Sequence, residues 1–335
     1  MTQGVLALSL GDPAGIGPEI VAKAWTALHQ SGPAFMVIGE AALLAAQGIR
    51  VQAVKDPHEA SAIFAKALPV LDLPLGHGVT TGLASKDHAP AIIRWIETGV
   101  SLALSGAVRG LVTAPISKAP LYEAGFKFPG HTEFLADLTA HVPMAGERGP
   151  VMMLTSGDLR AVLVTIHVPL AKVARALTQE AIIHTAKVTQ QALIRDFGIE
   201  KPRLVLAGLN PHAGEGGTIG DEEVHLLAPA VALLQAQGVA CSGPKPADTL
   251  FHDEARKTYD AVICLYHDQA LIPVKMLDFW GGVNVSLGLP IVRTSPDHGT
   301  GFDIAGKGLA RADSLIAAIR MADQITTTRA AQVRQ

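Results

Sequence analysis

Short apolar runs alternate along this chain with longer segments in which apolar residues recur every three or four positions. The short runs are rich in Val, Ile and Leu and predict strands, whereas the longer segments predict helices with one apolar face. The predicted strands are residues 5–10, 34–38, 110–113, 151–154, 161–166, 204–207 and 261–265. The predicted helices are residues 20–28, 90–105, 179–196, 222–237 and 314–326. Thr178 is the expected N-cap of the helix 179–196, and Gly198 is its expected end.

This alternation predicts an α/β protein with a largely parallel sheet that is covered by helices on both faces. The turn Ser156-Gly157-Asp158 joins two strand-like runs directly and predicts a hairpin. The sheet is therefore expected to be mixed. The polar segment 141–150 is the expected exposed connection.

Composition limits the function classes. Of the 335 residues, 49% are hydrophobic and 17% are charged, and the net charge of −3 gives no reason to expect a nucleic acid or an acidic membrane surface as a partner. No apolar stretch reaches the length of a membrane span, and the first residues lack the basic segment of a signal peptide. Cys241 and Cys264 follow no metal-binding spacing and are expected to be reduced thiols. We expect a cytoplasmic protein without nucleic-acid or membrane partners.

Three of the strand-like runs lead into a histidine, namely His167, His212 and His267. In α/β sheets, ligands bind outside the carboxyl ends of the strands. Three imidazoles delivered there can hold one divalent metal and leave a coordination position for a substrate. A single histidine after a strand usually has a structural role, so that alternative stays open for each residue alone. Recurrence at equivalent places favours the metal site.

Two glycine-containing segments are candidates for ligand contact. Residues 11–19 join the first strand to the first helix, where glycines permit a tight turn or the close approach of a ligand. They do not match the Gly-x-Gly-x-x-Gly dinucleotide fingerprint, and a purely structural turn is the alternative. Residues 130–133 precede an apolar helical pattern, so Thr132 is expected to cap that helix and its first free amides to attract a phosphate. His131 adds a donor at the same end.

Further polar groups gather later in the chain. The loop 210–217 combines three glycines with Asn, His and Glu, which is more chemistry than a simple turn requires. Lys275, Asn284 and Arg293 follow it. The point charge of a lysine and the planar fork of an arginine suit a phosphate and a carboxylate. Solvated surface charges are the alternative interpretation of both cations.

Five segments, in order over nearly the whole chain, resemble the 4-hydroxythreonine-4-phosphate dehydrogenase family of vitamin B6 biosynthesis. They are GDPAGIGPE (11–19), GHTE (130–133), NPHAGEGG (210–217), YHDQ (266–269) and RTSPDHGT (293–300). Each segment alone has little specificity, but five in register are highly specific. The first segment and HGTGFDIAGKG (298–308) are also similar to two segments of the isocitrate and isopropylmalate dehydrogenase superfamily, the latter to its adenosine-binding loop.

The resemblance implies two α/β/α domains that share one mixed, largely parallel sheet, with the active site in the cleft between them. The expected boundaries are 1–125 with 295–335 for the domain with the nucleotide-binding loops, and 126–294 for the domain with metal, substrate and dimer contacts. The implied cofactor is NAD or NADP. The implied cofactor contacts are Gly15, Gly17, His298, Gly299 and Asp303.

The resemblance also assigns roles to the candidate side chains. It makes His167, His212 and His267 the ligands of one divalent metal per subunit, either zinc, cobalt or magnesium. Imidazole ligands favour zinc or cobalt. It makes His131, Thr132, Lys275, Asn284 and Arg293 the contacts to a phosphorylated substrate. It implies a homodimer in which each site contains groups from both subunits.

The implied reaction is the oxidation of 4-phosphooxy-L-threonine at C3, followed by loss of CO2 from the resulting β-keto acid. Lys275, Asp248 and a metal-bound hydroxide are candidates for the general base. Asp248 and Asp268 are candidate acceptors that orient the histidine ligands.

Three alternatives remain. Related dehydrogenases share several segments and act on 4-phosphoerythronate, 4-phosphothreonate or aromatic cis-dihydrodiols. A metal-dependent phosphate-ester hydrolase leaves residues 298–308 unexplained. A non-catalytic protein that binds a metal or a phosphate would need no hydride acceptor.

Overall fold

The computed structural model describes residues 4–332 and divides into two compact units. Unit 1 contains the residues up to Pro143 together with Pro290–Thr327, and unit 2 contains Met144–Leu289 and the residues from Thr328. The predicted boundaries, 1–125 with 295–335 and 126–294, differ from this division. Residues 126–143 and 290–294 count with unit 1 because helix α6 packs against α4 and strand β12 pairs with β5.

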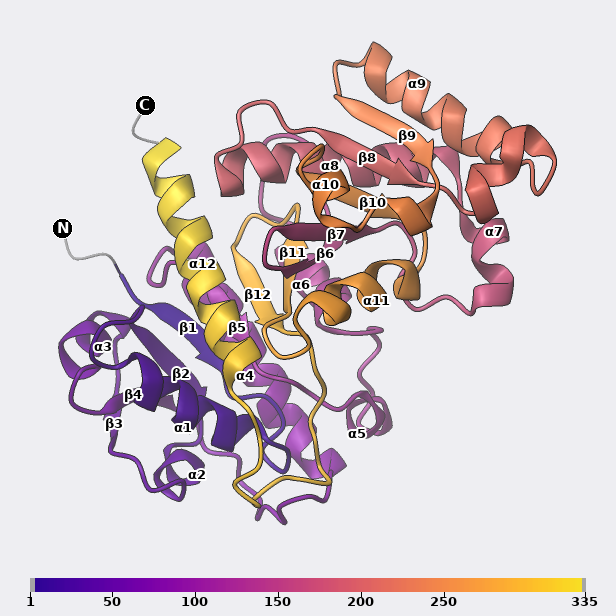
Figure 1. The fold of residues 1–335 in the computed structure, drawn as a ribbon. Coiled ribbons are helices and arrows are strands. Elements are labelled where there is room, and N and C mark those ends of the chain that lie inside the picture. The colour runs from indigo at the N-terminus through magenta and orange to yellow at the C-terminus, as the bar shows by residue number, and fades with distance from the viewer. Residues whose placement is uncertain (1–3, 333–335) are drawn as a thin grey trace. The chain divides into compact units, whose positions relative to one another are not determined.

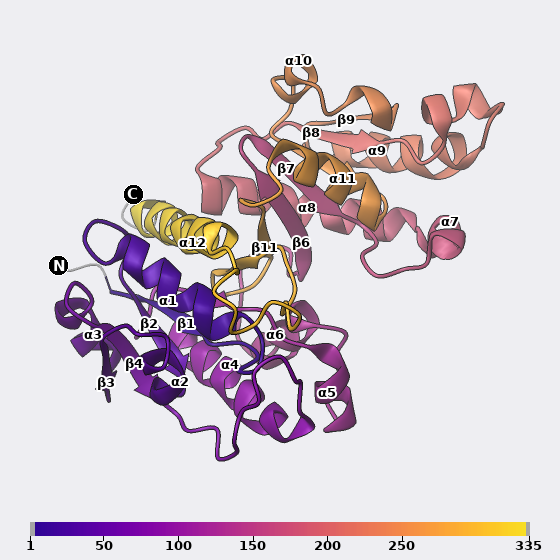
Figure 2. The ribbon, with the colours of Figure 1, turned by 60° about the horizontal axis from the view of Figure 1, so that its bottom comes forward.

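Unit 1 is built on parallel strands in the order β3–β4–β2–β1–β5–β12. The strands are β1 (Leu6–Ser9), β2 (Phe35–Gly39), β3 (Val51–Val54), β4 (Leu68–Asp72), β5 (Leu111–Thr113) and β12 (Arg293–Pro296). The helices are α1 (Gly17–Leu28), α2 (Ala41–Ala45), α3 (Pro57–Ile63), the short η1 (Lys86–His88), α4 (Ala89–Leu104), α5 (Lys118–Glu123), α6 (His131–Thr139) and α12 (Asp313–Gln332), whose last turn counts with unit 2. Helices α1 and α4 cover opposite faces of this sheet (Figure 2), as right-handed crossovers in opposite directions require.

Unit 2 has the strand order β11–β6–β7–β10–β8–β9 and is mixed, because β6 runs antiparallel to both of its neighbours. The strands are β6 (Val151–Ser156), β7 (Leu159–Leu163), β8 (Leu204–Ala207), β9 (Cys241–Lys245), β10 (Ala261–Cys264) and β11 (Val283–Leu287). The helices are η2 (Leu170–Lys172), α7 (Val173–Ala176), α8 (Gln179–Phe197), η3 (Pro211–Gly217), η4 (Glu223–Leu227), α9 (Ala228–Ala236), η5 (Ala247–Thr249), α10 (Asp253–Arg256) and α11 (His267–Leu277). Helices α8 and α11 cover opposite faces (Figure 1).

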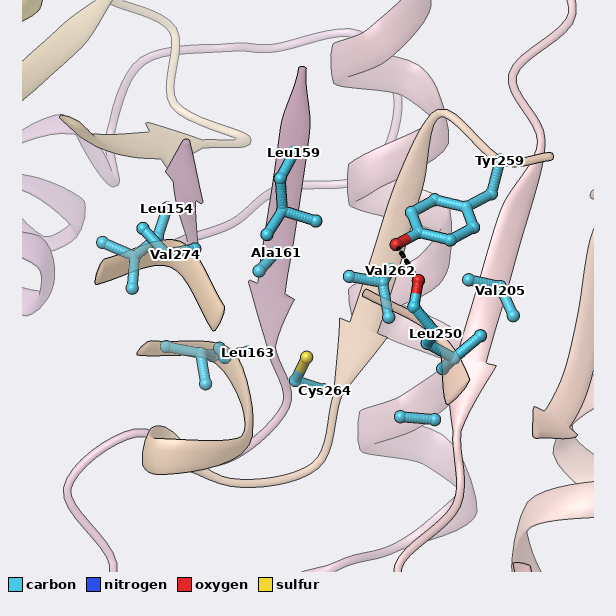
Figure 3. Packing of buried hydrophobic residues seen from close by; sticks show 12 residues of the cluster. Leu154, Leu159, Ala161, Leu163, Val205, Leu250, Tyr259, Val262, Cys264 and Val274 are labelled. Carbon is cyan, nitrogen blue, oxygen red and sulfur yellow. Dashed lines mark hydrogen bonds between the residues drawn. The ribbon is translucent and has the colours of Figure 1, made fainter. Parts of the chain in front are cut away.

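The core of unit 2 shows why strands β8 and β10 are apolar throughout. Val262 and Cys264 of β10 pack with Leu163 of β7 and Val274 of α11, and all four are almost completely buried (Figure 3). Strands covered on both faces need apolar side chains in both directions, which produces the continuous runs seen in the sequence. The buried Tyr259 hydroxyl in this cluster is satisfied, because it donates to the Leu250 carbonyl at 2.8 Å. Burial raises the pKa of the Cys264 thiol well above its ordinary range, and both cysteines are free and buried.

The predicted fold class is confirmed: the protein is α/β, with a mixed and largely parallel arrangement of strands. The predicted hairpin at Ser156-Gly157-Asp158 joins β6 to β7. The Thr178 hydroxyl caps α8 by accepting from the Ala181 N–H at 3.1 Å, and Gly198 ends that helix with a φ of 68°.

One predicted helix is interrupted. Residues 222–237 form the π-helical turn η4 followed by α9. Among the described residues, no helix combines the length and the apolar character needed to cross a bilayer.

Candidate metal and phosphate sites

The three predicted metal-binding histidines follow strands that are neighbours in unit 2. Strand β10 pairs in parallel with β7 on one side and with β8 on the other. Their carboxyl ends therefore lie at one edge of the sheet, where α/β proteins bind ligands. His167 follows β7, His212 follows β8, and His267 is the first residue of α11 after β10.

Two buried polar side chains tie these strand ends together. The Thr165 hydroxyl donates to the Leu265 carbonyl at 2.6 Å, which links the ends of β7 and β10. Gln269, which is 7% exposed, accepts from the Leu265 N–H and donates to the Gly208 carbonyl, both at 2.7 Å, which links β10 to β8. The segments that carry the histidines therefore start from fixed positions.

His167 and His267 approach each other, with 6.0 Å between their ring centroids. Both line a cavity of about 350 Å³, together with Tyr266 and several apolar residues. The Nδ1 of His267 lies 2.7 Å from Oδ1 of Asp268. Because a carboxylate can only accept, Nδ1 carries the proton and donates, which leaves Nε2 free to bind a metal. This arrangement, in which a carboxylate orients an imidazole, is typical of metal sites.

His212 lines a second cavity of about 410 Å³, with Asp248, Asn210 and Gln269 around it. Tyr266 lines both cavities, so they adjoin. Within residues 4–332 of a single chain, no three side chains of His, Cys, Asp or Glu come close enough together to hold a metal ion. One chain thus brings the three predicted histidines to adjoining cavities, but its described residues do not place three ligands around one point.

The remaining predicted groups of unit 2 lie on α11, β11 and η5. Lys275, on α11, places its Nζ 5.2 Å from the centre of the Phe279 ring. Asn284, on β11, has an Oδ1 that is inaccessible to solvent and accepts no hydrogen bond from the described residues. Asp248, on η5, is at the wall of the His212 cavity.

A buried cationic site lies in unit 1. Arg293, the first residue of β12, is only 2% exposed, and its Nη2 donates to the Thr113 hydroxyl on β5 at 2.6 Å. Burial lowers the pKa of Arg293 to about 9, and the charge of Glu133 acts in the opposite direction without offsetting it. A guanidinium that is poorly solvated and still protonated at neutral pH favours binding of an anion.

His131 and the start of α6 belong to the same site. Burial, and then the charges of Arg293 and Lys118, hold the pKa of His131 well below its ordinary value, so the ring is neutral at physiological pH. Its Nε2 is inaccessible and makes no hydrogen bond within the described part of the chain. The prediction that Thr132 caps α6 is wrong. His131 is already helical and the extended Gly130 is the N-cap, so Thr132 is the second residue of the helix and is buried.

Lys118 is absent from the predicted contacts, yet it lies close to this site. It begins α5, shortly after β5, and its charge contributes to the lowered pKa of His131. A Cβ atom on Gly130 would lie 3.8 Å from the Lys118 Nζ. The signal in the sequence was the same as for the histidines, namely a polar residue shortly after a buried strand.

The glycines of residues 11–19 are explained by the protein's own packing. A Cβ on Gly15 would lie 2.6 Å from the Thr300 carbonyl oxygen, and a Cβ on Gly17 would lie 2.5 Å from that of Leu10. The Ile16 N–H donates to the same Thr300 carbonyl at 2.8 Å. Gly299, in contrast, has open space around it. The loop after β1 and the segment after β12 therefore support each other directly.

Charged side chains of α1 extend this contact to the end of the segment that follows β12. Glu19, which is 7% exposed, accepts from the Ala310 N–H at 2.9 Å and from Lys23 Nζ at 2.8 Å. Lys23 Nζ also donates to the carbonyls of Gly308 and Ala310. The predicted cofactor contacts His298, Gly299 and Asp303 lie on this segment after β12 and are exposed.

With these sites described, comparison with known proteins is decisive about the family. The family model of the pyridoxal phosphate biosynthetic protein PdxA matches residues 32–322. A protein of Caulobacter vibrioides named 4-hydroxythreonine-4-phosphate dehydrogenase is 68% identical over 331 residues, covering 98% of this chain and 99% of that protein. The chain is a member of the PdxA family. The family resemblance of its five sequence segments is thereby confirmed.

Solved structures agree with PdxA membership. A crystal structure of 4-hydroxythreonine-4-phosphate dehydrogenase from Klebsiella pneumoniae superposes with a TM-score of 0.84 at 37% identity, covering 97% of this chain and 98% of that one. A terephthalate 1,2-cis-dihydrodiol dehydrogenase from Burkholderia xenovorans gives a TM-score of 0.64 at 28% identity, covering 96% and 98%. The PdxA fold is thus similar to that of a dehydrogenase with a different named substrate.

Proposed function

We propose that this chain is an NAD(P)-dependent dehydrogenase that oxidises 4-phosphooxy-L-threonine at C3. Carbon C3 loses a hydride to the nicotinamide and its hydroxyl group loses a proton to a base, which gives 2-amino-3-oxo-4-phosphooxybutanoate. This β-keto acid then loses CO2 and forms 3-amino-2-oxopropyl phosphate, for pyridoxine 5′-phosphate biosynthesis. The observation that carries the proposal is the buried Arg293 beside His131, in a PdxA chain whose relatives are named for a phosphorylated substrate.

The phosphate of the substrate binds where unit 1 offers buried donors. The Arg293 guanidinium provides a charged fork, the neutral His131 provides a ring N–H, and the first turn of α6 provides free amides near Thr132. Lys118 adds a second positive charge. Binding energy from this end of the substrate orients the reacting carbon. Lys275 and Asn284 complete the proposed substrate contacts.

His167, His212 and His267 hold the divalent metal in this proposal. The 6.0 Å separation of two of the rings and the Asp268 contact to His267 fit such a role. Their imidazoles favour zinc or cobalt over magnesium. The bound metal would lower the pKa of the C3 hydroxyl and polarise the ketone. Asp248, at the His212 cavity, and Lys275 are the two side chains proposed as the general base.

A cytoplasmic homodimer with shared sites is part of the proposal. In this proposal a second subunit completes the metal site, to which one chain contributes the neighbouring rings of His167 and His267. The nicotinamide cofactor, NAD or NADP, contacts the exposed residues His298, Gly299 and Asp303 of the segment after β12. Gly15 and Gly17 hold that segment in place.

The test is turnover of the purified protein with both nucleotides and a panel of phosphorylated four-carbon acids, with and without added metal. We expect reduction of the nicotinamide with 4-phosphooxy-L-threonine, and much slower reduction with 4-phosphoerythronate, 4-phosphothreonate or an aromatic cis-dihydrodiol. A preference for one of those three substrates would mean that the protein has the activity of a related dehydrogenase instead. Release of phosphate without any nucleotide would instead indicate a hydrolase.

A further inference from the structure

The loop that carries His212 has an unusual backbone. Five consecutive residues, from His212 to Gly216, lie in the left-handed region, with φ between 46° and 78°. Glycine adopts this conformation readily, but His212, Ala213 and Glu215 have side chains, and each costs about 1–2 kcal/mol there. Such a run persists only where the surroundings hold it in place. His212 begins the run, so the direction of its side chain depends on whatever anchors this loop.

Glu223 is the anchor that the contacts identify. It is 3% exposed, and its Oε1 accepts from the backbone N–H groups of Leu209 and Asn210, both at 2.7 Å. Its Oε2 accepts from Nδ2 of Asn210 at 2.8 Å. All three donors precede His212 by two or three residues, so this carboxylate fixes the chain at the point where the left-handed run begins.

The loop also closes tightly around this carboxylate. A Cβ on Gly214 would lie 2.7 Å from the Glu223 Oε2, and a Cβ on Gly220 would lie 2.3 Å from the Asn210 side chain. Glu223 itself starts the π-helical turn η4. Such wide turns are rare in proteins overall, and those that occur are often found at functional sites. Here the turn brings Glu223 to the loop, and Oε2 of the adjacent Glu222 accepts from the same Asn210 Nδ2 at 2.7 Å.

We propose that Glu223 is the positioning residue of His212. By accepting three hydrogen bonds at the start of the left-handed run, it presents the imidazole to the metal in one direction. This inference rests on the proposed metal role of His212. Glu223 itself touches neither metal nor substrate.

The chemistry of the contacts explains why a carboxylate stands at this position. All three partners of Glu223 are donors, and a carboxylate is the side-chain group that accepts on both oxygens. A glutamine at position 223 keeps an oxygen for the two backbone N–H groups but turns its own NH2 toward the Asn210 amide. Glu223→Gln is therefore a mild perturbation, and Glu223→Ala removes the whole anchor.

The experiment measures metal binding and backbone protection separately. Metal-free protein is titrated with Co²⁺ and followed by its visible absorption, for wild type, H212A, E223Q and E223A. E222Q is the matched control, because it changes a half-buried carboxylate on the same Asn210 amide. Hydrogen exchange of residues 209–217 is measured on the metal-free proteins. A thermal melt reports the stability of each variant.

We expect E223A to weaken Co²⁺ binding by about 10–100-fold, to change the Co²⁺ spectrum, and to speed exchange at Leu209 and Asn210. E223Q should give the same changes at smaller size, which keeps the test valid if E223A does not fold. E222Q should change Co²⁺ binding by less than about 3-fold. Loss of binding in H212A with wild-type binding and spectra in both Glu223 variants would overturn the positioning role alone. Unaltered binding in H212A would overturn the metal role of His212 and this inference with it.

Discussion

Arg293 in unit 1 and Asp196 in unit 2 are both almost completely buried charges, but their surroundings have opposite effects. At Asp196, burial acts to raise the pKa, yet hydrogen bonds and charges from Arg329 and Arg195 outweigh it and the pKa is lowered. The Asp196 carboxylate accepts from Arg195 at 2.8 and 3.1 Å and from Nη2 of Arg329 at 3.0 Å. At Arg293, burial prevails over the charge of Glu133 and lowers the pKa to about 9.

The difference distinguishes a structural charge from one that is proposed to bind a ligand. Asp196 is stabilised in its charged form by the protein, so it is expected to contribute to folding. Burial destabilises the charged form of Arg293, which fits the proposed role of this residue in binding an anion. Perturbed groups of the second kind are the ones that mark functional sites.

The largest expected effect is on folding. Asp196→Ala should lower the free energy of unfolding by about 3–5 kcal/mol, because it leaves Arg329 and Arg195 without their buried carboxylate. Chemical denaturation measures this loss. Asp313→Ala is the matched control, since Asp313 pairs with Arg311 on the surface at 2.9 Å and should contribute less than about 1 kcal/mol. Equal losses in the two variants would contradict a special role for burial at Asp196.

The second effect is on substrate binding. Arg293→Ala should raise KM for the phosphorylated substrate by about 10–150-fold, the equivalent of losing a charge-assisted contact of about 1.5–3 kcal/mol. It should leave KM for the nucleotide and the thermal stability of the free protein nearly unchanged. Arg329→Ala removes an arginine of the Asp196 cluster instead and should give the reverse pattern. A large loss of stability in Arg293→Ala would place this residue with the structural charges.

The third effect is the pH dependence of stability. The lowered pKa of Asp196 means that its contribution is complete above the pKa of an unfolded aspartate, about 3.9. That contribution is lost as the pH falls through the folded pKa, because the unfolded chain takes up the proton first. The stability difference between wild type and Asp196→Asn should therefore be constant near neutrality and shrink below about pH 4. Unfolding curves of both proteins over this range measure it, and a difference that grows in acid would refute the assignment.

The smallest effect is expected at the N-cap of α8, the helix that also contains Asp196. Thr178→Ala should destabilise the protein by about 1 kcal/mol, because the exposed hydroxyl caps α8 through the Ala181 N–H. Thr178→Ser keeps that acceptor and should remain near wild type. Chemical denaturation of both variants provides the measurement, and a cost as large as that of Asp196→Ala would remove the contrast between exposed and buried partners.

The fold was predictable where strands are continuously apolar, as in β2, β8 and β10. Strands β3, β4, β9, β11 and β12 were not predicted, and all five contain polar residues. Strand β12, Arg-Thr-Ser-Pro, is entirely buried, and it is a strand because it pairs with β5. Pairing of this kind is a tertiary effect that no local pattern records.

The candidate site follows the same division. The positions of His167, His212 and His267 after neighbouring parallel strands could be inferred from the order of apolar runs. The approach of Lys118 to His131 and the link that Gln269 makes between β10 and β8 depend on how distant segments meet. No local pattern in the sequence predicts either contact. The left-handed run at His212 was also hidden, since only three of residues 210–217 are glycine and the strained positions are not.

The contact between Gly15 and Thr300 has a consequence for any redesign of the proposed nucleotide contacts. The loop after β1 and the segment closed by Glu19 and Lys23 behave as one block, because backbone already fills the space that a side chain would need. Libraries that vary the glycines of residues 11–19 would separate this block before they changed any ligand contact. The open surroundings of Gly299 make it the position where a new side chain can enter without disturbing its neighbours.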